Sequence, residues 1–312
     1  MEGYRCVKSA DLHLTPLHAL IGPNDSGKSS LLRAMHDSVG TTWWVKGGGW
    51  LEGQLGPQDR SATVNGFGSS HYPAKQAGGP HWRNLADPLW GRAVLRLDPD
   101  ELRKDVNLLP SGAALWFQNE KGLGLAGLYD ALLGRDRNAF IAIETRFRSL
   151  FPTAAGLRLD NSSNATKALG LTLVGGKKVS AAEMSEGMLY WLAFAIIEHL
   201  APQSMLFIEE PENGLHPARI AEVMRVLHEV SQRTQIILAT HSPLVINELR
   251  PEEVTIVTRT AEDGTRCKPM IETKHFETRK QVYALGELWL SFADGDEERD
   301  LVTGGEVDSK AG

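Results

Sequence analysis

Apolar residues follow two different patterns along the chain. Nearly continuous apolar runs predict buried strands, because a strand covered on both faces loses the apolar–polar alternation of an exposed one. These runs lie at residues 17–21, 205–208, 235–239 and 254–257, and further strands are expected at 5–14 and 93–97. Apolar residues at helical spacing predict helices after residue 28 and at 125–133, 138–150, 186–200 and 218–230. Strands that alternate with helices indicate an α/β fold with a mainly parallel sheet covered on both faces.

Two segments depart from this pattern. Residues 169–174 and 177–181 flank Gly175 and Gly176, which predicts a hairpin with a two-glycine turn. Residues 40–91 contain five of the eight tryptophans among glycines and prolines, and they show neither a strand nor a helix period. We expect an irregular insert there that covers part of the core edge. The alternative is a partner-binding surface.

The expected organisation is a single domain over residues 1–312. Its parts are N-terminal strands with a glycine-rich loop at 1–39, the Gly/Trp-rich insert at 40–92, a helical subdomain with the hairpin at 93–184, a strand-and-helix core at 185–260 and a C-terminal segment at 261–312.

Composition narrows the class of protein. A hydrophobic share of 42% and a charged share of 23% are ordinary for a globular chain. The formal charge of −6 argues against a protein that mainly coats DNA or an anionic membrane. The longest apolar run, at residues 189–197, is far shorter than the ~20 residues that span a bilayer, so a soluble protein is expected. Two cysteines, without metal-ligand spacing, fit a reducing cytoplasm.

The segment GPNDSGKSS at residues 22–30 fits the pattern G-x-x-x-x-G-K-[ST] between a predicted strand and a predicted helix. Backbone N–H groups must turn inward around a phosphate, which requires glycines where a Cβ would block the approach. Lys28 is expected to bridge the β- and γ-phosphates of ATP, and Ser29 to provide one ligand of Mg²⁺. The strand and helix on either side disfavour a chance glycine-rich turn. The predicted nucleotide-binding residues here are Gly22, Pro23, Asn24, Asp25, Ser26, Gly27, Lys28, Ser29 and Ser30.

Two acidic residues, Glu209 and Glu210, follow the apolar run at 205–208. Ligands of open α/β sheets lie beyond the carboxyl ends of the strands, so both acids should face the phosphates. One is expected to hold Mg²⁺, and its neighbour to orient or deprotonate the attacking water. The competing interpretation is a solvated acidic turn at the end of a core strand.

A second anion site is predicted at the start of the apolar helix at 186–200. Ser185 suits a helix N-cap, and Gly187 exposes backbone N–H groups at the helix start. Ser185 lies 24 residues before Glu209.

Extended through ENGLHP at 212–217, the segment around the two acids resembles the ABC-type P-loop ATPases of the SMC/RecF branch, related to the ATPase domain of OLD-type proteins. The phosphate loop, the pair Tyr4-Arg5 and the segment MSEGM at 184–188, which is similar to the ABC signature, agree with this resemblance. It covers residues 4–35 and 180–247, and the helical middle more loosely. It implies a P-loop NTPase fold with an ABC-ATPase-like head, a mainly parallel central sheet, antiparallel N-terminal strands and a helical subdomain.

By this resemblance, Glu210 is the catalytic carboxylate and His241, in the segment IILATHSP at 236–243, is the switch histidine that contacts the γ-phosphate. Glu209 occupies the position where the family has Asp, which leaves metal affinity and the hydrolysis rate open. The signature of one subunit, with Ser185 and Gly187, is expected to cover the nucleotide of another, giving an ATP-dependent head-to-tail homodimer. The glutamine-loop candidates are Gln118 and Gln54.

The sequence does not identify the partner that the predicted ATPase acts on. The first hypothesis is an ATPase component of a bacterial defence system that acts through a separate effector, because the stretch after His241 is shorter than the nuclease domain of larger OLD-type relatives. A second is a DNA-repair or chromosome-associated ATPase, which the acidic balance and the lack of a long coiled-coil insertion disfavour. A membrane-transporter subunit ranks last, since its signature usually reads LSGGQ. A non-hydrolysing nucleotide sensor is a further alternative, suggested by Glu209.

Overall fold

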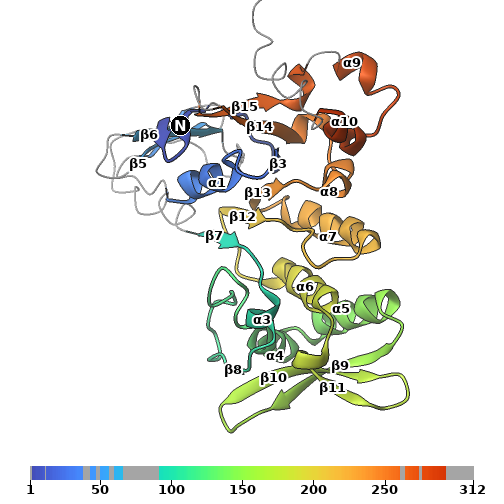
Figure 1. Ribbon diagram of the computed structural model, residues 1–312. Helices are drawn as coiled ribbons and strands as arrows, with labels where there is room; N and C mark the ends of the chain where they lie inside the picture. Colours follow the sequence, from blue (N-terminus) through green and yellow to red (C-terminus); the bar gives the residue numbers. More distant parts are fainter. Residues whose placement is uncertain are drawn as a thin grey trace, which may run out of the picture. The chain divides into compact units, whose positions relative to one another are not determined.

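A computed structural model describes residues 1–312 except 1, 11, 38–42, 47–49, 56–59, 66–90, 261–263, 274–275 and 293–312. The chain forms two compact units. Unit 1 consists of Met1–Arg92, Ser204–Pro211 and Thr234–Gly312, and unit 2 of Ala93–Gln203 and Glu212–Arg233. Figure 1 colours both along the sequence, and each is described by itself below.

The centre of unit 1 is a mainly parallel sheet in the order β15-β14-β3-β13-β12. Its strands are β3 (Leu17–Ile21), β12 (Met205–Glu209), β13 (Gln235–Thr240), β14 (Val254–Thr260) and β15 (Gly264–Pro269), of which only β15 runs antiparallel to its neighbour. Every residue of β3, β12 and β13 is buried, which confirms the strands predicted from apolar runs. The register pairs Glu209 with Ala239 and Thr240 with Ile21, so the carboxyl ends of three strands meet at one edge.

The N-terminus forms a hairpin of β1 (Glu2–Tyr4) and β2 (Val7–Ser9), so the single strand expected over residues 5–14 is wrong. Tyr4 pairs with Val7, which leaves Arg5 and Cys6 as a two-residue turn. Arg5 has φ +52°, a left-handed conformation that glycine or asparagine usually supplies. The sequence therefore carries no ordinary turn signal at this place, although the expectation of antiparallel N-terminal strands is confirmed.

The insert expected to be irregular contains a three-stranded antiparallel sheet. It is formed by β4 (Trp43–Lys46), β5 (Trp50–Leu55) and β6 (Arg60–Asn65), which corrects the expectation for this part of residues 40–91. Strands of four to six residues are too short to show a sustained period. Residues 66–90, which contain Trp82 and Trp90, lie outside the described residues.

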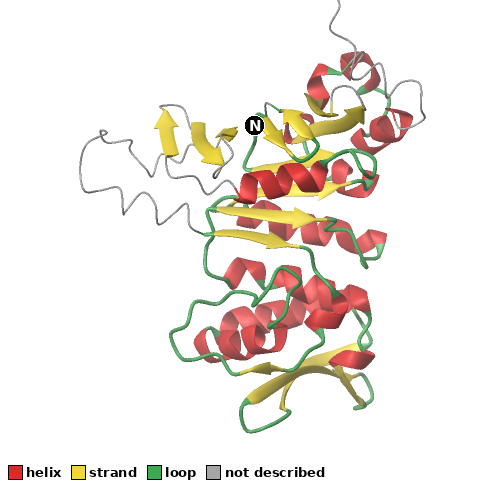
Figure 2. Ribbon diagram, turned by 60° about the vertical axis from the view of Figure 1, so that its left-hand side comes forward, coloured by secondary structure: helices red, strands yellow, loops and turns green. Residues whose placement is uncertain are grey.

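Helices line the sheet of unit 1. Helix α1 (Lys28–Asp37) contacts β12 and β13 and buries Leu31, Leu32 and Met35 (Figures 1 and 2). The short helices η3 (Pro251–Glu253), η4 (Met270–Glu272) and α9 (Phe276–Arg279) complete the C-terminal part.

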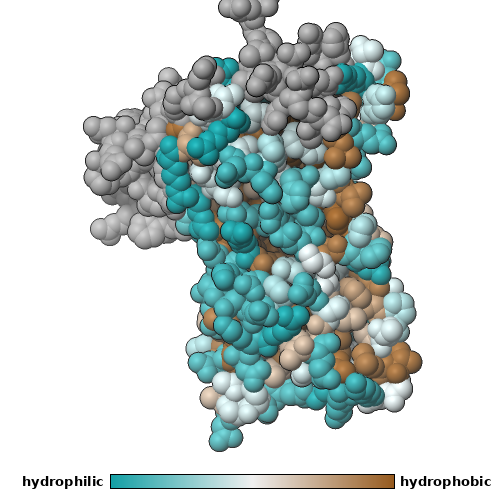
Figure 3. Space-filling model, viewed as in Figure 1, coloured by the Kyte–Doolittle hydropathy of each residue, from teal (hydrophilic) through white to brown (hydrophobic). Residues whose placement is uncertain are grey.

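Helix α8 (Pro243–Asn247) packs against α10 (Leu285–Phe292), and a Cβ at Gly286 would lie 2.3 Å from the backbone oxygen of Pro243. Leu244 and Leu290 remain exposed, and Figure 3 shows hydrophobic surface over these two helices. The contact with α10 holds α8 in place, and α8 begins two residues after His241.

Unit 2 combines helices with a small antiparallel sheet. Its strands are β8 (Val106–Asn107), β9 (Ala154–Asn161), β10 (Thr166–Leu173) and β11 (Lys178–Ser180). The strand β7 (Arg92–Leu95) does not belong to this sheet, and it begins at the last residue of the first segment of unit 1. Its helices are α3 (Pro99–Leu102), α4 (Leu125–Arg135), α5 (Arg137–Leu150), η1 (Ala181–Glu183), α6 (Glu186–Ala195), η2 (Ile197–His199) and α7 (Pro217–Val230). Helices α4 and α5 contact β9 and β10 (Figure 2). The β10–β11 hairpin turns at Gly175 and Gly176, both at positive φ, as predicted.

Aromatic side chains join the helices in the core of unit 2. Tyr129 is fully buried and its hydroxyl donates to the backbone oxygen of Leu192 at 2.9 Å. The rings of Phe147 and Trp191 lie 5.8 Å apart between centroids, which joins α5 to α6. These contacts fix the apolar helix that the sequence predicted at 186–200, although α6 ends at Ala195 and a 3₁₀ turn follows.

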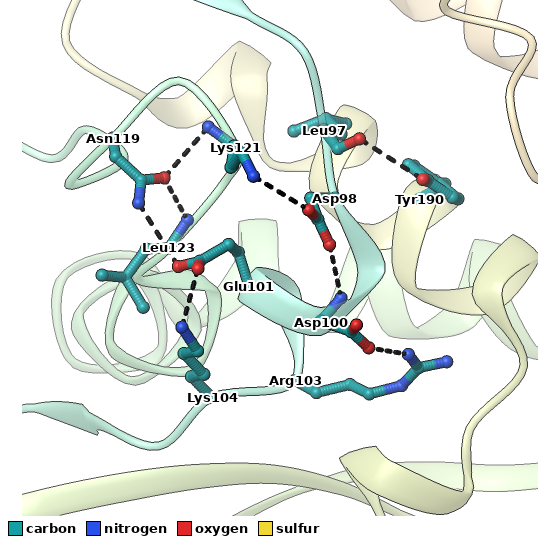
Figure 4. A network of polar contacts seen from close by, with 10 residues as sticks. All are labelled: Leu97, Asp98, Asp100, Glu101, Arg103, Lys104, Asn119, Lys121, Leu123 and Tyr190. Carbon is teal, nitrogen blue, oxygen red and sulfur yellow. Dashed lines mark hydrogen bonds and ion pairs between the residues drawn. The ribbon is translucent and has the colours of Figure 1, made fainter.

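A polar network holds the start of α3 in unit 2 (Figure 4). Asp98 accepts the backbone N–H of Asp100 at 2.9 Å as the N-cap, and its carboxylate lies 3.3 Å from the ammonium of Lys121. The hydroxyl of Tyr190, on α6, donates to the backbone oxygen of Leu97 at 3.3 Å. The network therefore connects the loop before α3 to the helix that begins at the signature-like segment.

Candidate functional site

The predicted phosphate loop joins β3 to α1 in unit 1, and its glycines are sterically required. A Cβ at Gly22 would lie 2.1 Å from the backbone oxygen of Val257. Gly27 has φ +104°, and a Cβ there would lie 2.2 Å from Thr265 Oγ1. Asp25 also adopts a left-handed φ of +71°. The backbone thus takes the concave form in which successive N–H groups can surround an anion.

One buried hydroxyl of the loop forms no hydrogen bond with the described residues. Ser26 is 2% exposed, and its Oγ has no hydrogen-bond partner among the described residues. A buried polar atom without a partner costs on the order of 1–3 kcal/mol. The loop therefore contains a buried hydroxyl whose hydrogen-bonding capacity no described residue uses.

Lys28 is the first residue of α1. Its ammonium donates to the backbone oxygens of Gly22 at 2.7 Å and Pro23 at 2.8 Å, so it lies across the loop. The backbone N–H of Leu31 donates to the oxygen of Gly27 at 2.9 Å, which carries the helix pattern back into the loop. The site therefore combines a positive side chain with the positive end of a helix.

Glu209, the last residue of β12, is 7% exposed. Ser29 Oγ donates to Glu209 Oε2 at 3.1 Å, and Arg33 Nε lies 3.9 Å from Oε1. Two oxygens bound next to each other on an octahedral Mg²⁺ at ~2.1 Å lie about 3.0 Å apart, close to the spacing of Ser29 and Glu209. This pair fits a magnesium ion. Among the described residues no three His, Cys, Asp or Glu side chains gather as a metal cluster, so further ligands would have to come from phosphate and water.

Glu210 directly follows the strand and has φ +50°, a strained conformation for a residue with a side chain. Its backbone N–H donates to the oxygen of Ala239 at 2.8 Å, so β13 holds the bend in place. His241 Nδ1 lies 4.0 Å from Glu210 Oε1, and these side chains are 50% and 34% exposed. The bend lets Glu210 point toward His241 while Glu209 contacts Ser29, as expected if the two acids divide their roles.

A cavity of about 170 Å³ lies over the phosphate loop in unit 1. The cavity is large enough for several water molecules or for a phosphate group. It is lined by Cys6, Asn24, Asp25, Gly27, Lys28, Ser29, Ser30, Glu209, Glu210, Ala239 and Arg259. The predicted residues Gly22, Pro23 and Ser26 belong to the same loop without lining the cavity, and His241 is joined to it through Glu210.

The signature-like residues lie in unit 2. Ser185 is exposed and caps α6, with its Oγ accepting the N–H of Met188 at 3.4 Å. A Cβ at Gly187 would lie 3.0 Å from the oxygen of Gly214, and Gly214 itself has φ +67° beneath the ring of Tyr190. The helix start and the ENGLHP segment are therefore packed together within unit 2. The second anion site stays a prediction.

The two glutamine candidates have no established role. The backbone N–H of Gln118, an exposed residue in a loop of unit 2, donates to the oxygen of Leu123 at 2.7 Å. Gln54 lies on β5, and its side chain is outside the described residues.

Cys6 and Arg259 line the cavity but carry no motif, and sequence reasoning missed them. Cys6 occupies the turn of a hairpin that was expected as one strand, and Arg259 is an exposed residue near the end of β14. Burial alone raises the pKa of the Cys6 thiol, but hydrogen bonds with Ser30 and Thr265 and the positive charge of Arg259 outweigh this and lower it. Both cysteines are free.

Within the described part of the chain, no helix is long and apolar enough to span a bilayer.

Known proteins share parts of this sequence and fold. Residues 100–247 match the family described as AAA domain, putative AbiEii toxin, Type IV TA system. Over 43 residues, 14% of this chain, the sequence is 42% identical to OLD nuclease from Thermus scotoductus, and the match covers 8% of that protein. These matches confirm the resemblance to ATPases of the SMC/RecF/OLD-like type for the segments they cover.

Solved structures of SMC heads align with this chain at low sequence identity. The SMC head domain from Thermotoga maritima aligns with TM-score 0.45 and 14% identity, over 83% of this chain and 92% of that chain. The SMC head bound to the C-terminal winged-helix domain of ScpA aligns with TM-score 0.48 and 16% identity, over 82% and 90%.

Proposed function

We propose that this chain, whose motifs are those of a P-loop ATPase of the SMC/RecF/OLD-like type, binds ATP with Mg²⁺ in the cavity of unit 1 and hydrolyses it. One observation supports the proposal most strongly: Lys28 and Ser29 of the phosphate loop line the same cavity as Glu209 and Glu210. A positive loop for phosphate and a pair of acids for metal and water then lie within one site.

Binding follows from the loop. The Lys28 ammonium, which donates to two backbone oxygens of the loop, would donate to a bound phosphate instead. The phosphate would also accept hydrogen bonds from the backbone N–H groups at the start of α1. A phosphate oxygen carries negative charge and a backbone oxygen does not, so the ammonium binds the phosphate more strongly and the exchange favours the phosphate.

Magnesium is supported by the Ser29–Glu209 pair. A bound Mg²⁺ would supply positive charge that offsets the charge developing on the phosphates. Ser29 Oγ and the Glu209 carboxylate would hold it directly or through water. Burial of Glu209 keeps its carboxylate oriented toward Ser29, which limits the freedom that its extra methylene, compared with Asp, would otherwise add.

Hydrolysis is assigned to Glu210. Its carboxylate, held by the strained bend at the cavity edge, accepts a proton from the attacking water. His241 lies 4.0 Å away and donates to the phosphate or to the water that Glu210 orients. Removal of the Glu210 charge should therefore slow chemistry and leave nucleotide binding nearly unchanged.

Phosphate release with ATP and Mg²⁺ tests this function. We expect wild-type protein to release phosphate, Glu210→Gln to release at least ~100-fold less while it still binds ATP, and Lys28→Ala to lose binding. Glu229→Gln, which changes an exposed carboxylate of α7, is the control and should behave as wild type. ATP binding by wild-type protein without any phosphate release would instead favour a non-hydrolysing nucleotide sensor, the alternative suggested by Glu209.

Dimerisation is the next part of the proposal. Exposed Ser185 at the start of α6 presents backbone N–H groups that could cover the nucleotide of a second subunit, so ATP would join two heads in a head-to-tail homodimer. Light scattering of Glu210→Gln in excess ATP should show a dimer. Addition of Ser185→Arg should return it to a monomer without loss of ATP binding, and a monomer in both variants would refute this part.

The partner is proposed as a separate effector protein in a bacterial defence system. The family description names a putative toxin of a toxin–antitoxin system, and the curated relative is an OLD nuclease, although the chain covers only 8% of that relative. A repair or chromosome-associated role is the alternative. It predicts a duplex affinity that falls steeply with salt, whereas the net charge of −6 favours little binding.

A further inference from the structure

Thr265, on β15, attaches the hairpin of β14 and β15 to the phosphate loop. Thr265 Oγ1 donates to the backbone oxygen of Ser26 at 2.9 Å, and the N–H of Thr265 donates to the oxygen of Cys6 at 2.9 Å. Thr265 is 1% exposed and lies against Gly27, where a Cβ would clash with its hydroxyl. The position of this hairpin relative to the loop is therefore fixed by buried contacts.

Arg259 stands directly opposite Thr265 in the antiparallel register. Residues paired in this way project from the same face of a sheet, so Arg259 faces the side on which Thr265 meets the loop. Arg259 is exposed and lines the cavity. Among the described residues, no carboxylate forms an ion pair with Arg259.

Two adjacent serines of α1 line the cavity and contact different groups. Ser29 donates to Glu209, and Ser30 forms a hydrogen bond with Cys6, on which the charge of Arg259 also acts. Lys28 and Arg259 are the two cationic residues among the described residues that line the cavity. With its terminal group at Lys28 and the acids, a phosphate chain would therefore have its inner phosphate near Cys6 and Arg259.

We propose that Arg259 is a further nucleotide-binding residue, which donates to the phosphate nearest the nucleoside while Lys28 holds the terminal phosphates. This inference rests on the proposed function, because it assumes a nucleoside di- or triphosphate in the cavity of unit 1. Guanidinium suits the role, since its planar donors bind two phosphate oxygens at once. The thiol of Cys6 lies beside the bound phosphate and is covered by it.

Equilibrium binding of ATP and ADP to Arg259→Ala tests the proposal. Both ligands share the inner phosphate, so both should weaken by a similar factor, on the order of tenfold. Arg266→Ala is the matched control: it removes an equal charge from an exposed position of the same hairpin, one residue after Thr265 and on the opposite face. It should bind both nucleotides as wild type does.

Each outcome separates this inference from the proposed function. If wild-type protein binds ATP and Arg259→Ala binds it equally well, the inference fails while the proposed function stands. If only ATP weakens and ADP does not, Arg259 contacts the terminal phosphate and the assigned end is wrong. If wild-type protein binds neither nucleotide, the proposed function itself fails. Arg259→Lys, which keeps the charge but loses the planar fork, should recover part of the affinity for both ligands.

Alkylation of Cys6 by iodoacetamide gives a second readout that needs no activity. Burial raises the pKa of the Cys267 thiol to about 12, so Cys6 should be the thiol that reacts near neutral pH. ATP or ADP should slow the reaction in wild-type protein. Arg259→Ala should move the pH profile of alkylation upward, because a charge that favours the thiolate is gone. An unchanged profile, or no protection by saturating nucleotide, would overturn the placement of the phosphate chain.

Discussion

The imidazole of His18 is buried in β3, the strand that leads into the phosphate loop. It is 1% exposed, its Nε2 lies 2.9 Å from Thr255 Oγ1, and its Nδ1 lies 3.1 Å from Thr15 Oγ1. Burial lowers the pKa of His18 to about 3, since no negative charge compensates for removing an imidazolium from water. The folded protein therefore keeps this ring neutral at pH values where the unfolded chain protonates it.

The sign and size of the effect follow from linkage. Above pH 6.5 both states carry neutral His18, and its contribution to stability is complete. Between pH 6.5 and about 3 the unfolded chain binds a proton that the folded chain does not, so stability falls as the pH falls. From pH 7 to pH 5 the loss from this one group is about 2 kcal/mol.

Urea unfolding of wild-type protein and His18→Gln at pH 7, 6 and 5 measures this contribution. His18→Gln removes the titrating group, so its free energy of unfolding should fall between pH 7 and 5 by about 2 kcal/mol less than that of wild type. His13→Gln, at an exposed position of the same unit, should keep the wild-type dependence. Equal pH dependence of wild type and His18→Gln would refute the reasoning.

Four further substitutions have defined outcomes. Gly22→Ala places a Cβ 2.1 Å from the oxygen of Val257 and should reduce ATP affinity in a binding titration by at least about tenfold, since the loop must shift. Gly214→Ala should lower the free energy of unfolding by roughly 2 kcal/mol or more, and with it the melting temperature. The reason is that it combines φ +67° with a Cβ 2.3 Å from the ring of Tyr190. Gly134→Ala, in α4 with nothing within 4 Å of the new Cβ, should instead stabilise it by about 0.5–1 kcal/mol, and destabilisation there would contradict the packing described. Glu209→Asp introduces the residue that the similar ATPases carry and should change the Mg²⁺ dependence of phosphate release, whereas an identical magnesium titration would argue against Glu209 as a metal ligand.

Strong local signals allowed much of the fold to be predicted. The strands at 17–21, 205–209 and 235–240 are buried on both faces, so their apolar runs were unambiguous. The hairpin at 175–176 was evident because both turn residues are glycines at positive φ. By contrast, the turn at Arg5 uses a residue that seldom adopts its conformation, and the strands at 43–65 are too short for a period to emerge.

The candidate site divides in the same way. The residues from Asn24 to Ser30 and the acids Glu209 and Glu210 belong to contiguous motifs, which chemistry makes recognisable without a structure. Arg259 and Cys6 reach the cavity only through tertiary contacts, the register with Thr265 and the turn after Tyr4. No local sequence pattern predicts that Arg259 and Cys6 line the same cavity. The strained φ of Glu210 was likewise invisible in the sequence.

Calorimetric titration of ATP with Mg²⁺ into wild-type protein and into Lys28→Ala tests the central claim most directly. The account predicts saturable binding to wild-type protein and a loss of at least about 100-fold in affinity for the variant, because Lys28 is the charge that the phosphate loop contributes to the cavity. Equal affinity of the two proteins, or no binding to either, would contradict it.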